Sequence, residues 1–198
     1  MPTRIAMLAS GSGSNVENFV GYFDNHPSVE IALVVCDRPG AYVLDRAGRL
    51  GIPSELIPGP GWQEPAPIIQ KLRARKIDFL VLAGFLRLVP PGILRKYPDR
   101  ILNIHPALLP AFGGKGMYGM HVHRAVIASG ARESGVSIHL VNERYDEGRI
   151  LFQARVDIAP DDSPESLAEK VHVLEYAHYP RVVEQYIQGI SSPAGTGP

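Results

Sequence analysis

Asn103 and His105 lie two positions apart in the apolar segment 101–105, which reads ILNIH and is followed by a proline. Side chains two apart on a strand point to the same face, so an amide donor and a titratable imidazole would be neighbours there. With carboxylates on nearby loops, such a pair suits proton transfer and oxyanion stabilisation while a nucleophile attacks a carbonyl. The alternative is a strand end whose polar side chains only cap backbone groups, which a lone Asn-x-His does not exclude.

The segment 10–15, SGSGSN, is a second candidate site, because it joins an apolar run to a helical pattern. Strand, glycine-rich turn and helix is typical of nucleotide-binding α/β folds, in which backbone amides and the helix dipole attract phosphate. Val16 stands where a dinucleotide motif has its third glycine, and the Gly-Lys-Ser/Thr of a P-loop is missing. The turn therefore favours a single phosphate or a phosphorylated sugar, although it could also serve only tight packing.

Other kinds of catalytic site lack the residues they need. His121 and His123 are two apart at a predicted helix start, where the helix would splay them, and no HExxH pattern accompanies them. No Gly-x-Ser-x-Gly elbow is present for a serine nucleophile. His139 lies in an alternating strand pattern and is expected to be a packed, hydrogen-bonded histidine rather than a ligand. We therefore expect no metal.

The composition is that of an ordinary globular protein. The chain has 198 residues, 45% of them hydrophobic and 20% charged, with 20 basic and 20 acidic side chains. This charge balance gives no reason to expect nucleic acid or a membrane surface as a partner. With no signal sequence, no membrane-spanning stretch and Cys36 as the single cysteine, a reducing, cytoplasmic setting is expected.

Apolar runs that alternate with helical patterns predict the elements that must position these residues. Strands and helices alternate through most of the chain, which predicts a doubly wound, mainly parallel α/β sheet of Rossmann-like form. Two later runs joined by a polar turn without a helix predict an antiparallel strand pairing near the C-terminal part. Predicted strands cover residues 4–9, 30–36, 53–57, 79–83, 101–105, 133–141 and 150–156, and predicted helices cover 16–23, 41–50, 68–75, 121–129 and a stretch from Pro91.

Two segments beside the predicted strands leave alternatives open. Three prolines and two glycines in residues 58–65 exclude regular structure, and Trp62 could either pack this loop down or line a pocket. The apolar stretch 84–89 leaves a buried strand at its C-terminal end, where open α/β sheets hold ligands, although ordinary core would explain it equally well.

The C-terminal part is expected to be one long helix and a tail. Ser163 supplies the N-cap and Pro164 the first helical position, and Pro180 is expected to kink or restart the helix. Residues 1–190 are expected to form a single domain, and the Gly/Pro/Ser-rich tail 191–198 is expected to be disordered.

The chain also carries a set of sequence motifs. They are SGSGSN at 10–15, LAGFLRLV at 82–89, LNIHPALLPAF at 102–112, HxHR at 121–124, SIHLV at 137–141, DEG at 146–148 and ILFQA at 150–154. Together they resemble the glycinamide ribonucleotide formyltransferases, the folate-dependent enzymes of purine biosynthesis, over about residues 3–190. NIHPALLP alone is shared with other folate formyl hydrolases and transferases, whereas the glycine-rich loop at the N-terminus and the short length point to the purine enzymes.

The resemblance implies catalytic roles for three residues. Asn103 and His105 would stabilise the oxyanion formed when the amine of N1-(5-phospho-D-ribosyl)glycinamide attacks the formyl carbon of 10-formyltetrahydrofolate. Asp146 would pair with His105, favour its charged form and manage the proton that leaves the amine. A carboxylate beside an imidazole does stabilise the imidazolium, which agrees with the chemistry inferred from the residues alone.

The resemblance also implies two binding regions, one in each half of the domain. The N-terminal half would hold the ribonucleotide and the C-terminal half the folate, with no metal, no further partner and a monomeric or homodimeric state. The ribonucleotide contacts would be Gly13, Ser14, Asn15 and Glu175. The folate contacts would be Leu86, Arg87, Leu88, Val89, Asn103, Asn142, Glu143, Arg144, Tyr145 and Asp146. A formyltetrahydrofolate hydrolase and a non-catalytic phosphate-sugar binding protein are the alternatives.

The sequence departs from the family pattern in three places. Residues 113–120, GGKGMYGM, are longer by roughly five residues than the shortest family form, so this loop could be a mobile lid or a solvated insertion. Lys115 in this loop could contact a phosphate or the folate tail. A basic residue common around positions 62–65 is missing, and His172 replaces a polar amide or basic residue.

Overall fold

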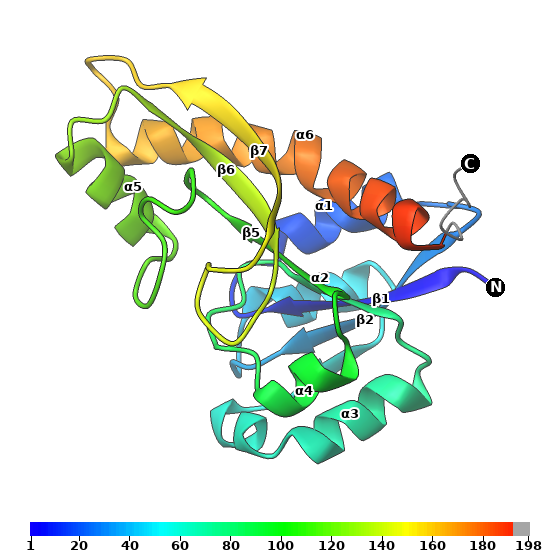
Figure 1. The fold of residues 1–198 in the computed structure, drawn as a ribbon. Coiled ribbons are helices and arrows are strands. Elements are labelled where there is room, and N and C mark those ends of the chain that lie inside the picture. Colours follow the sequence, from blue (N-terminus) through cyan, green and yellow to red (C-terminus); the bar gives the residue numbers. More distant parts are fainter. Residues whose placement is uncertain (192–198) are drawn as a thin grey trace, which may run out of the picture.

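The computed structural model describes residues 1–191, which form one seven-stranded sheet between two layers of helices (Figure 1). The strand order is β3-β2-β1-β4-β5-β6-β7. The first five strands of this order pair in parallel, while β6 pairs antiparallel with both β5 and β7. The strands are β1 Thr3–Ala9, β2 Val29–Cys36, β3 Ser54–Leu56, β4 Phe79–Leu82, β5 Ile101–His105, β6 Glu133–Leu140 and β7 Ile150–Asp157. The predicted mainly parallel sheet with an antiparallel pairing is therefore confirmed.

Helices cover both faces of the sheet. The helices are α1 Ser14–Tyr22, α2 Tyr42–Arg49, α3 Pro65–Ala74, α4 Pro91–Lys96, α5 Met120–Ala128 and α6 Pro164–Ser191, with a short 3-10 helix η1 Gly59–Gln63. Buried side chains of α1, α2, α5 and α6 share one apolar core, and those of η1, α3 and α4 share the other. Along β1, Ile5 and Met7 face the first core while Ala6 and Leu8 face the second, as the alternation of a strand buried on both sides requires. None of the helices within residues 1–191 combines the length and the apolar character needed to cross a membrane.

The order of the strands decides where the loops separate. The chain runs from β1 outward to β2 and β3, then returns to place β4 and β5 on the other side of β1. The loops that follow β1 and β4 therefore leave adjacent strands in opposite directions, which opens a crevice at the carboxyl ends of the strands. Residues 10–13 and 84–89 lie in these two loops, and Ser14 and Asn15 begin α1.

The loop at residues 58–65 is more regular than predicted, since it contains η1. Pro58 and Pro60 fix φ near the value of a first helical turn, so prolines start this helix rather than prevent it. The indole N–H of Trp62 donates to the Ile57 carbonyl at 2.8 Å, and its ring lies 4.7 Å from that of Phe85. Trp62 is 5% exposed, so it packs the loop onto the second core.

Helix α6 runs through Pro180 as one element, so of the predicted kink or restart the restart is wrong. Proline lacks the N–H that would bond the carbonyl of residue 176, four positions earlier. The side-chain amide of Asn18, on α1, donates to that Tyr176 carbonyl at 3.1 Å. A contact from another helix thus satisfies the group that the proline leaves free. Of the tail predicted at 191–198, residue 191 ends this helix and the remainder lies outside the described residues.

Tyr179, the residue before Pro180, anchors α6 to the centre of the sheet. Its side chain is fully buried. Its hydroxyl lies 2.8 Å from the Leu82 carbonyl oxygen at the end of β4 and 3.1 Å from the Leu102 carbonyl oxygen in β5. One side chain therefore reaches both strands from which the catalytic candidates and the segment 84–89 emerge.

Candidate active site

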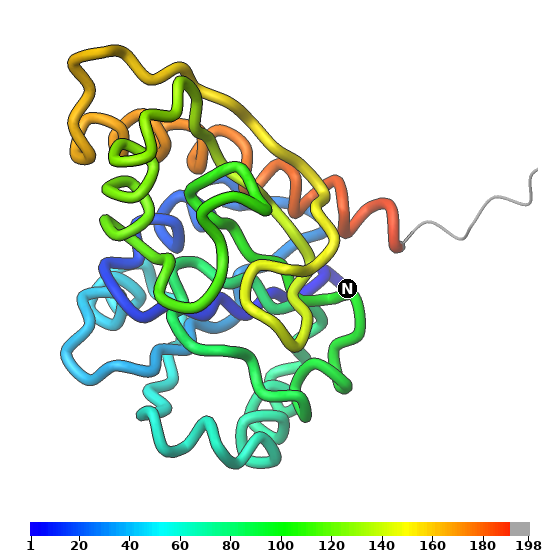
Figure 2. The backbone as a smooth tube through the Cα atoms, turned by 60° about the vertical axis from the view of Figure 1, so that its left-hand side comes forward, coloured from blue at the N-terminus to red at the C-terminus, as the bar shows by residue number. Residues whose placement is uncertain are grey.

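A cavity of about 670 Å³ opens at the crevice between the loops that follow β1 and β4. This volume is within the usual range for small-molecule sites. Its wall also includes residues of the loop between β5 and α5 and of the turn between β6 and β7. Figure 2 shows this loop (green) and this turn (yellow) on the same side of the molecule. Segments from both halves of the sequence therefore build one site.

Asn103 and His105 both line this cavity from β5. In the antiparallel pair, Asn103 lies opposite His139 of β6, and His105 lies opposite Ser137. Residues directly opposite in a ladder share a face of the sheet, so these four side chains gather on one side. The Asn103 amide nitrogen lies 3.0 Å from Nε2 of His139 and 3.4 Å from Oδ1 of Asp146.

His105 is 3% exposed and is held from two sides. Its Nε2 donates to the Phe112 carbonyl at 2.8 Å, and its Nδ1 lies 3.5 Å from Oδ2 of Asp146. Burial lowers the pKa of His105, and this outweighs the Asp146 carboxylate and the Phe112 carbonyl, which raise it. The pairing that the family resemblance implies is thus present in space, but the free imidazole is mainly neutral at pH 7.

Asp146 reaches this cluster from the turn between β6 and β7. Its φ of 57° lies in the left-handed region, and a Cβ on Gly148 would overlap with the Leu140 carbonyl oxygen. The Gly114 N–H donates to Oδ2 of Asp146 at 3.0 Å. Burial raises the pKa of Asp146, but the contact with His139, the His105 imidazole and the Gly114 N–H together lower it. The carboxylate therefore stays ionised at neutral pH.

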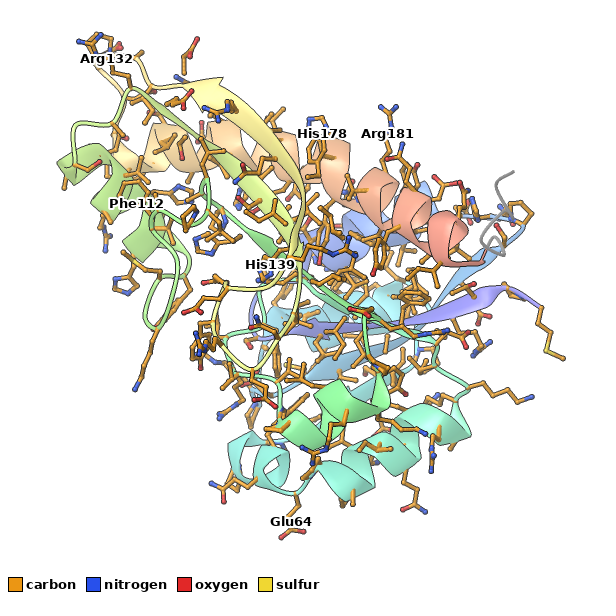
Figure 3. All side chains as sticks on the ribbon, viewed as in Figure 1. Glu64, Phe112, Arg132, His139, His178 and Arg181 are labelled. Atoms are coloured by element: carbon orange, nitrogen blue, oxygen red, sulfur yellow. The ribbon has the colours of Figure 1, made fainter. Side chains whose placement is uncertain are left out.

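His139 is a member of the cluster that the sequence left as a packing residue. It is 2% exposed, and its Nδ1 lies 2.8 Å from the Leu140 carbonyl, which can only accept a hydrogen bond. Its Nε2 lies 3.0 Å from the Asn103 amide nitrogen and 3.6 Å from Oδ1 of Asp146, so the ring contacts both of these side chains. Figure 3 labels His139 where β6 meets the turn, and Phe112 in the loop between β5 and α5. In the sequence, His139 and Ser137 are two positions apart and so share a face of a strand. Which residues they face can be known only from the register between β5 and β6.

The other end of the cavity contains the candidate ribonucleotide residues. Gly13, Ser14, Asn15 and Glu175 all line it, although 160 positions separate Asn15 from Glu175. The Asn15 amide donates to Oε2 of Glu175 at 2.9 Å, and its own Oδ1 is buried without a partner among residues 1–191. Glu175 is 7% exposed, and burial raises its pKa, against His172 and Asn15, which lower it. This end thus offers a buried carboxyl and a free acceptor, both of which suit hydroxyl or amine groups of a sugar substrate.

The candidate folate residues divide into two groups. The segment 84–89 and the residues 144–146 line the cavity, including Leu86, Arg87, Leu88, Val89, Arg144 and Tyr145. Asn142 and Glu143 do not; the side chain of Asn142 instead accepts the Arg144 N–H at 2.9 Å within the turn. The guanidinium of Arg87 is held at the cavity wall, since its Nε donates to the buried carboxylate of Asp37 at 2.6 Å.

The loop at 113–120 forms part of the wall beside the histidines. Lys115, Met117 and Tyr118 line the cavity, and Lys115 is exposed. On α5, His121 is exposed while His123 is buried and lines the cavity, so the helix does separate the two rings. Within the part of the chain that the structure describes, no group of three or more His, Cys, Asp or Glu side chains is arranged to hold a metal ion.

Comparison with known protein families identifies the family of this chain. A family model described as formyl transferase matches residues 3–183, and the chain therefore belongs to the formyl transferase family. This confirms, at the level of the family, the resemblance seen in the sequence.

Within this family, the chain is similar to proteins named phosphoribosylglycinamide formyltransferase. The chain is 34% identical to that of Bacillus subtilis over 189 residues, covering 93% of this chain and 94% of the relative. It is 42% identical to the chloroplastic one of Arabidopsis thaliana over 186 residues, covering 91% of this chain and 64% of the relative. The chain thus spans somewhat less than two thirds of the length of the plant protein. The crystal structure of phosphoribosylglycinamide formyltransferase from Bacillus halodurans matches with a TM-score of 0.86 and 35% identity, covering 96% of this chain and 97% of that one.

Proposed function

We propose that this chain transfers the formyl group of 10-formyltetrahydrofolate to the amine of N1-(5-phospho-D-ribosyl)glycinamide, a step of de novo purine biosynthesis. The observation that carries the proposal is the position of Asn103, His105 and Asp146 at one wall of a cavity that also contains the glycine-rich loop. A phosphorylated amine bound at that loop would extend toward the three side chains. Relatives named for this activity support the same reading.

The reaction makes one bond and breaks one. The substrate amine attacks the formyl carbon, the oxyanion of the tetrahedral intermediate collapses, and the C–N10 bond breaks as N10 receives the proton that the amine has lost. Asn103 donates an amide N–H to the oxyanion. The N–H that faces Asp146 can do so, because its 3.4 Å contact is the weaker of the two that the Asn103 amide makes. Asp146 takes the proton lost by the amine, through water, because its low pKa keeps it ionised at neutral pH.

His105 contributes differently in the free and the reacting state. Burial keeps its pKa low before substrate binds. The oxyanion adds a second negative charge beside the ring, in addition to Asp146, and this raises the affinity of the imidazole for a proton. The interaction between the His105 ring and the formyl oxygen is therefore stronger in the transition state than in the neutral formamide, and such a difference is what accelerates the reaction.

One domain would hold both substrates. Residues 1–190 act as one formyl-transfer domain, with the ribonucleotide at the loop 10–15 and the folate along residues 84–89 and 144–146. Both partners are small molecules, the folate is a co-substrate, and the chain works as a monomer or homodimer. A reducing cytoplasmic setting suits its one thiol, Cys36, which is free and buried.

A formyl-transfer assay tests the proposal. The full chain is mixed with 10-formyltetrahydrofolate, with and without the ribonucleotide, and the folate product is followed by its absorbance. We expect turnover only with the ribonucleotide, and losses of about 10²–10⁴-fold in Asn103→Ala, His105→Ala and Asp146→Ala. His121→Ala removes an exposed histidine of α5 and is the matched control, with near-normal turnover expected.

Two outcomes would contradict the proposal. Equal folate consumption without the ribonucleotide would identify a hydrolase, in which water replaces the amine. Full activity of His105→Ala, with the wild-type melting temperature, would exclude the mechanism given above.

A further inference from the structure

Helix α2 contacts the glycine-rich loop at three consecutive positions. The Val43 N–H donates to the Gly11 carbonyl at 3.1 Å, and Nε of Arg46 donates to the Ser12 carbonyl at 3.1 Å. Gly13 has a φ of 75°, and a Cβ there would overlap with the Val43 side chain. The loop is therefore pressed against α2, with two of its carbonyl groups bonded to that helix.

These bonds decide which way the loop amides point. In a trans peptide unit the C=O and the following N–H point in opposite directions. Since the Gly11 and Ser12 carbonyls are directed to α2, the N–H groups of Ser12 and Gly13 are directed away from it. Both residues line the cavity, and neither N–H has a hydrogen-bond partner among residues 1–191. A pair of free amides beside the start of α1 is a binding site for an anion.

We propose that Arg46 is the positioning residue of the phosphate site: it holds the Ser12 carbonyl so that the Gly13 amide faces the phosphate of the substrate. The proposal rests on the proposed function, because it takes a phosphorylated ribose as the ligand of this loop. Arg46 acts through the loop backbone and does not itself need to touch the substrate. Its side chain is 15% exposed, so its position is well defined by its surroundings.

The other contacts of Arg46 explain why an arginine is needed. Its Nη1 forms an ion pair with Glu17 in the first turn of α1, and its guanidinium lies 5.2 Å from the centre of the Tyr42 ring. The planar fork can bond a carbonyl through Nε and a carboxylate through Nη1 at the same time, which a lysine ammonium cannot do in this geometry. The ion pair also offsets a carboxylate that would otherwise repel phosphate at the start of α1.

Arg49 offers a matched control on the same helix. Its guanidinium lies 5.0 Å from the centre of the same Tyr42 ring, and its Nη2 donates to the Tyr42 hydroxyl at 2.6 Å. It has no contact with the glycine-rich loop among residues 1–191. Arg46→Met and Arg49→Met thus remove the same charge at similar positions, and only the first releases the Ser12 carbonyl.

The test measures phosphate recognition with and without catalysis. Binding of ribose 5-phosphate by calorimetry is compared with binding of ribose, and kcat/KM is compared for glycinamide ribonucleotide and its dephosphorylated riboside. In Arg46→Met we expect ribose 5-phosphate affinity and kcat/KM for the ribonucleotide to fall about tenfold or more, as for loss of a charge-assisted hydrogen bond. Activity on the riboside and the melting temperature should change little, and Arg49→Met should behave as the wild type.

A double variant separates positioning from simple charge. In Arg46→Met/Glu17→Gln the unpaired carboxylate is removed, while the Ser12 carbonyl stays released; we expect phosphate recognition to remain low. Recovery in this double variant, or equal losses in Arg46→Met and Arg49→Met, would overturn the proposal. If ribose 5-phosphate binding depends on Arg46 but no variant or wild type transfers formyl groups, the proposed function fails and the role of Arg46 stands.

Discussion

His105 shows how two opposing effects set the protonation state of one candidate catalytic side chain. Burial lowers its pKa, and the carboxylate of Asp146, 3.5 Å away, raises it by less. The ring is therefore mainly neutral in the free protein, and in the proposed reaction an oxyanion beside it would raise its pKa. The Asp146 carboxylate does not make His105 charged in the free protein, but it lowers the free energy needed to protonate the ring.

Asp146→Asn tests this relation directly. The amide keeps the shape of the side chain but removes the charge that raises the pKa of His105, so that pKa should fall further. NMR titration of the His105 ring should show its midpoint at lower pH, and kcat should fall by about 10²-fold or more. Glu147→Gln, in the same turn but paired with the exposed Arg144, should move neither quantity. An unchanged His105 titration in Asp146→Asn would disprove the coupling.

His123 makes stability depend on pH. It is buried with Nδ1 unpartnered among residues 1–191, and burial, followed by His172 and His105, lowers its pKa from 6.5 to about 4. Between these pH values the unfolded chain binds a proton that the folded chain does not, so the free energy of unfolding falls as the pH falls through this window.

Thermal denaturation of His123→Gln at pH 7 and pH 5 tests this. The drop in melting temperature between the two pH values should be smaller in His123→Gln than in the wild type, because the group that titrates only in the unfolded chain is gone. His121→Gln changes an exposed histidine of the same helix and should retain the wild-type drop. An equal drop in all three proteins would show that His123 does not contribute.

At the scale of the elements, α6 depends on a neighbour for its continuity. Asn18 of α1 donates to the Tyr176 carbonyl that Pro180 leaves without its helical partner. Asn18→Ala should lower the free energy of unfolding by about 1 kcal/mol, the usual value for one such hydrogen bond. In a Pro180→Ala background the helix regains its own N–H, so Asn18→Ala should cost less there. Urea denaturation of the four proteins of this cycle measures the difference, and equal costs in both backgrounds would exclude the role of Asn18.

The elements also show which features can be predicted from sequence. The strand with Asn103 and His105 was predictable because alternation is a local property, and the buried strands because their apolar runs end in turns. His139 was missed because its place beside Asn103 depends on the register between β5 and β6, set by the whole sheet. The sequence left a kink or a restart open at Pro180, because continuity there depends on a side chain 158 positions away. η1 was missed because three prolines and two glycines so close together were taken to exclude regular structure, although Pro60 lies in the first turn of η1.

At the scale of the whole molecule, the two proposed substrate regions are joined through Ser10. Its N–H donates to the Gly84 carbonyl at 3.1 Å, and its Oγ accepts the Leu86 N–H at 3.1 Å. Ser10 is 3% exposed and is the first residue of the glycine-rich loop. The loop assigned to the ribonucleotide therefore holds the loop assigned to the folate.

Ser10→Ala should show this connection in the kinetics. Without Oγ the Leu86 N–H loses its acceptor, and the wall at 84–89 becomes less well ordered, so KM for the folate should rise roughly tenfold. KM for the ribonucleotide should change less, although Ser10 adjoins that site. Ser134→Ala, at a buried serine whose Oγ has no partner within residues 1–191, is the control and should leave both KM values unchanged. Unchanged KM for the folate in Ser10→Ala would refute the connection.

Tyr179 has a consequence for the interior of the site. The pairing of β4 with β5 ends at Leu82 and Asn103, and beyond this point the two strands separate. The hydroxyl of Tyr179 lies within hydrogen-bonding distance of the Leu82 carbonyl in β4 and of the Leu102 carbonyl in β5. A side chain of α6 thus links the two strands where they begin to separate, so the spacing of the strands at this point depends on the position of α6.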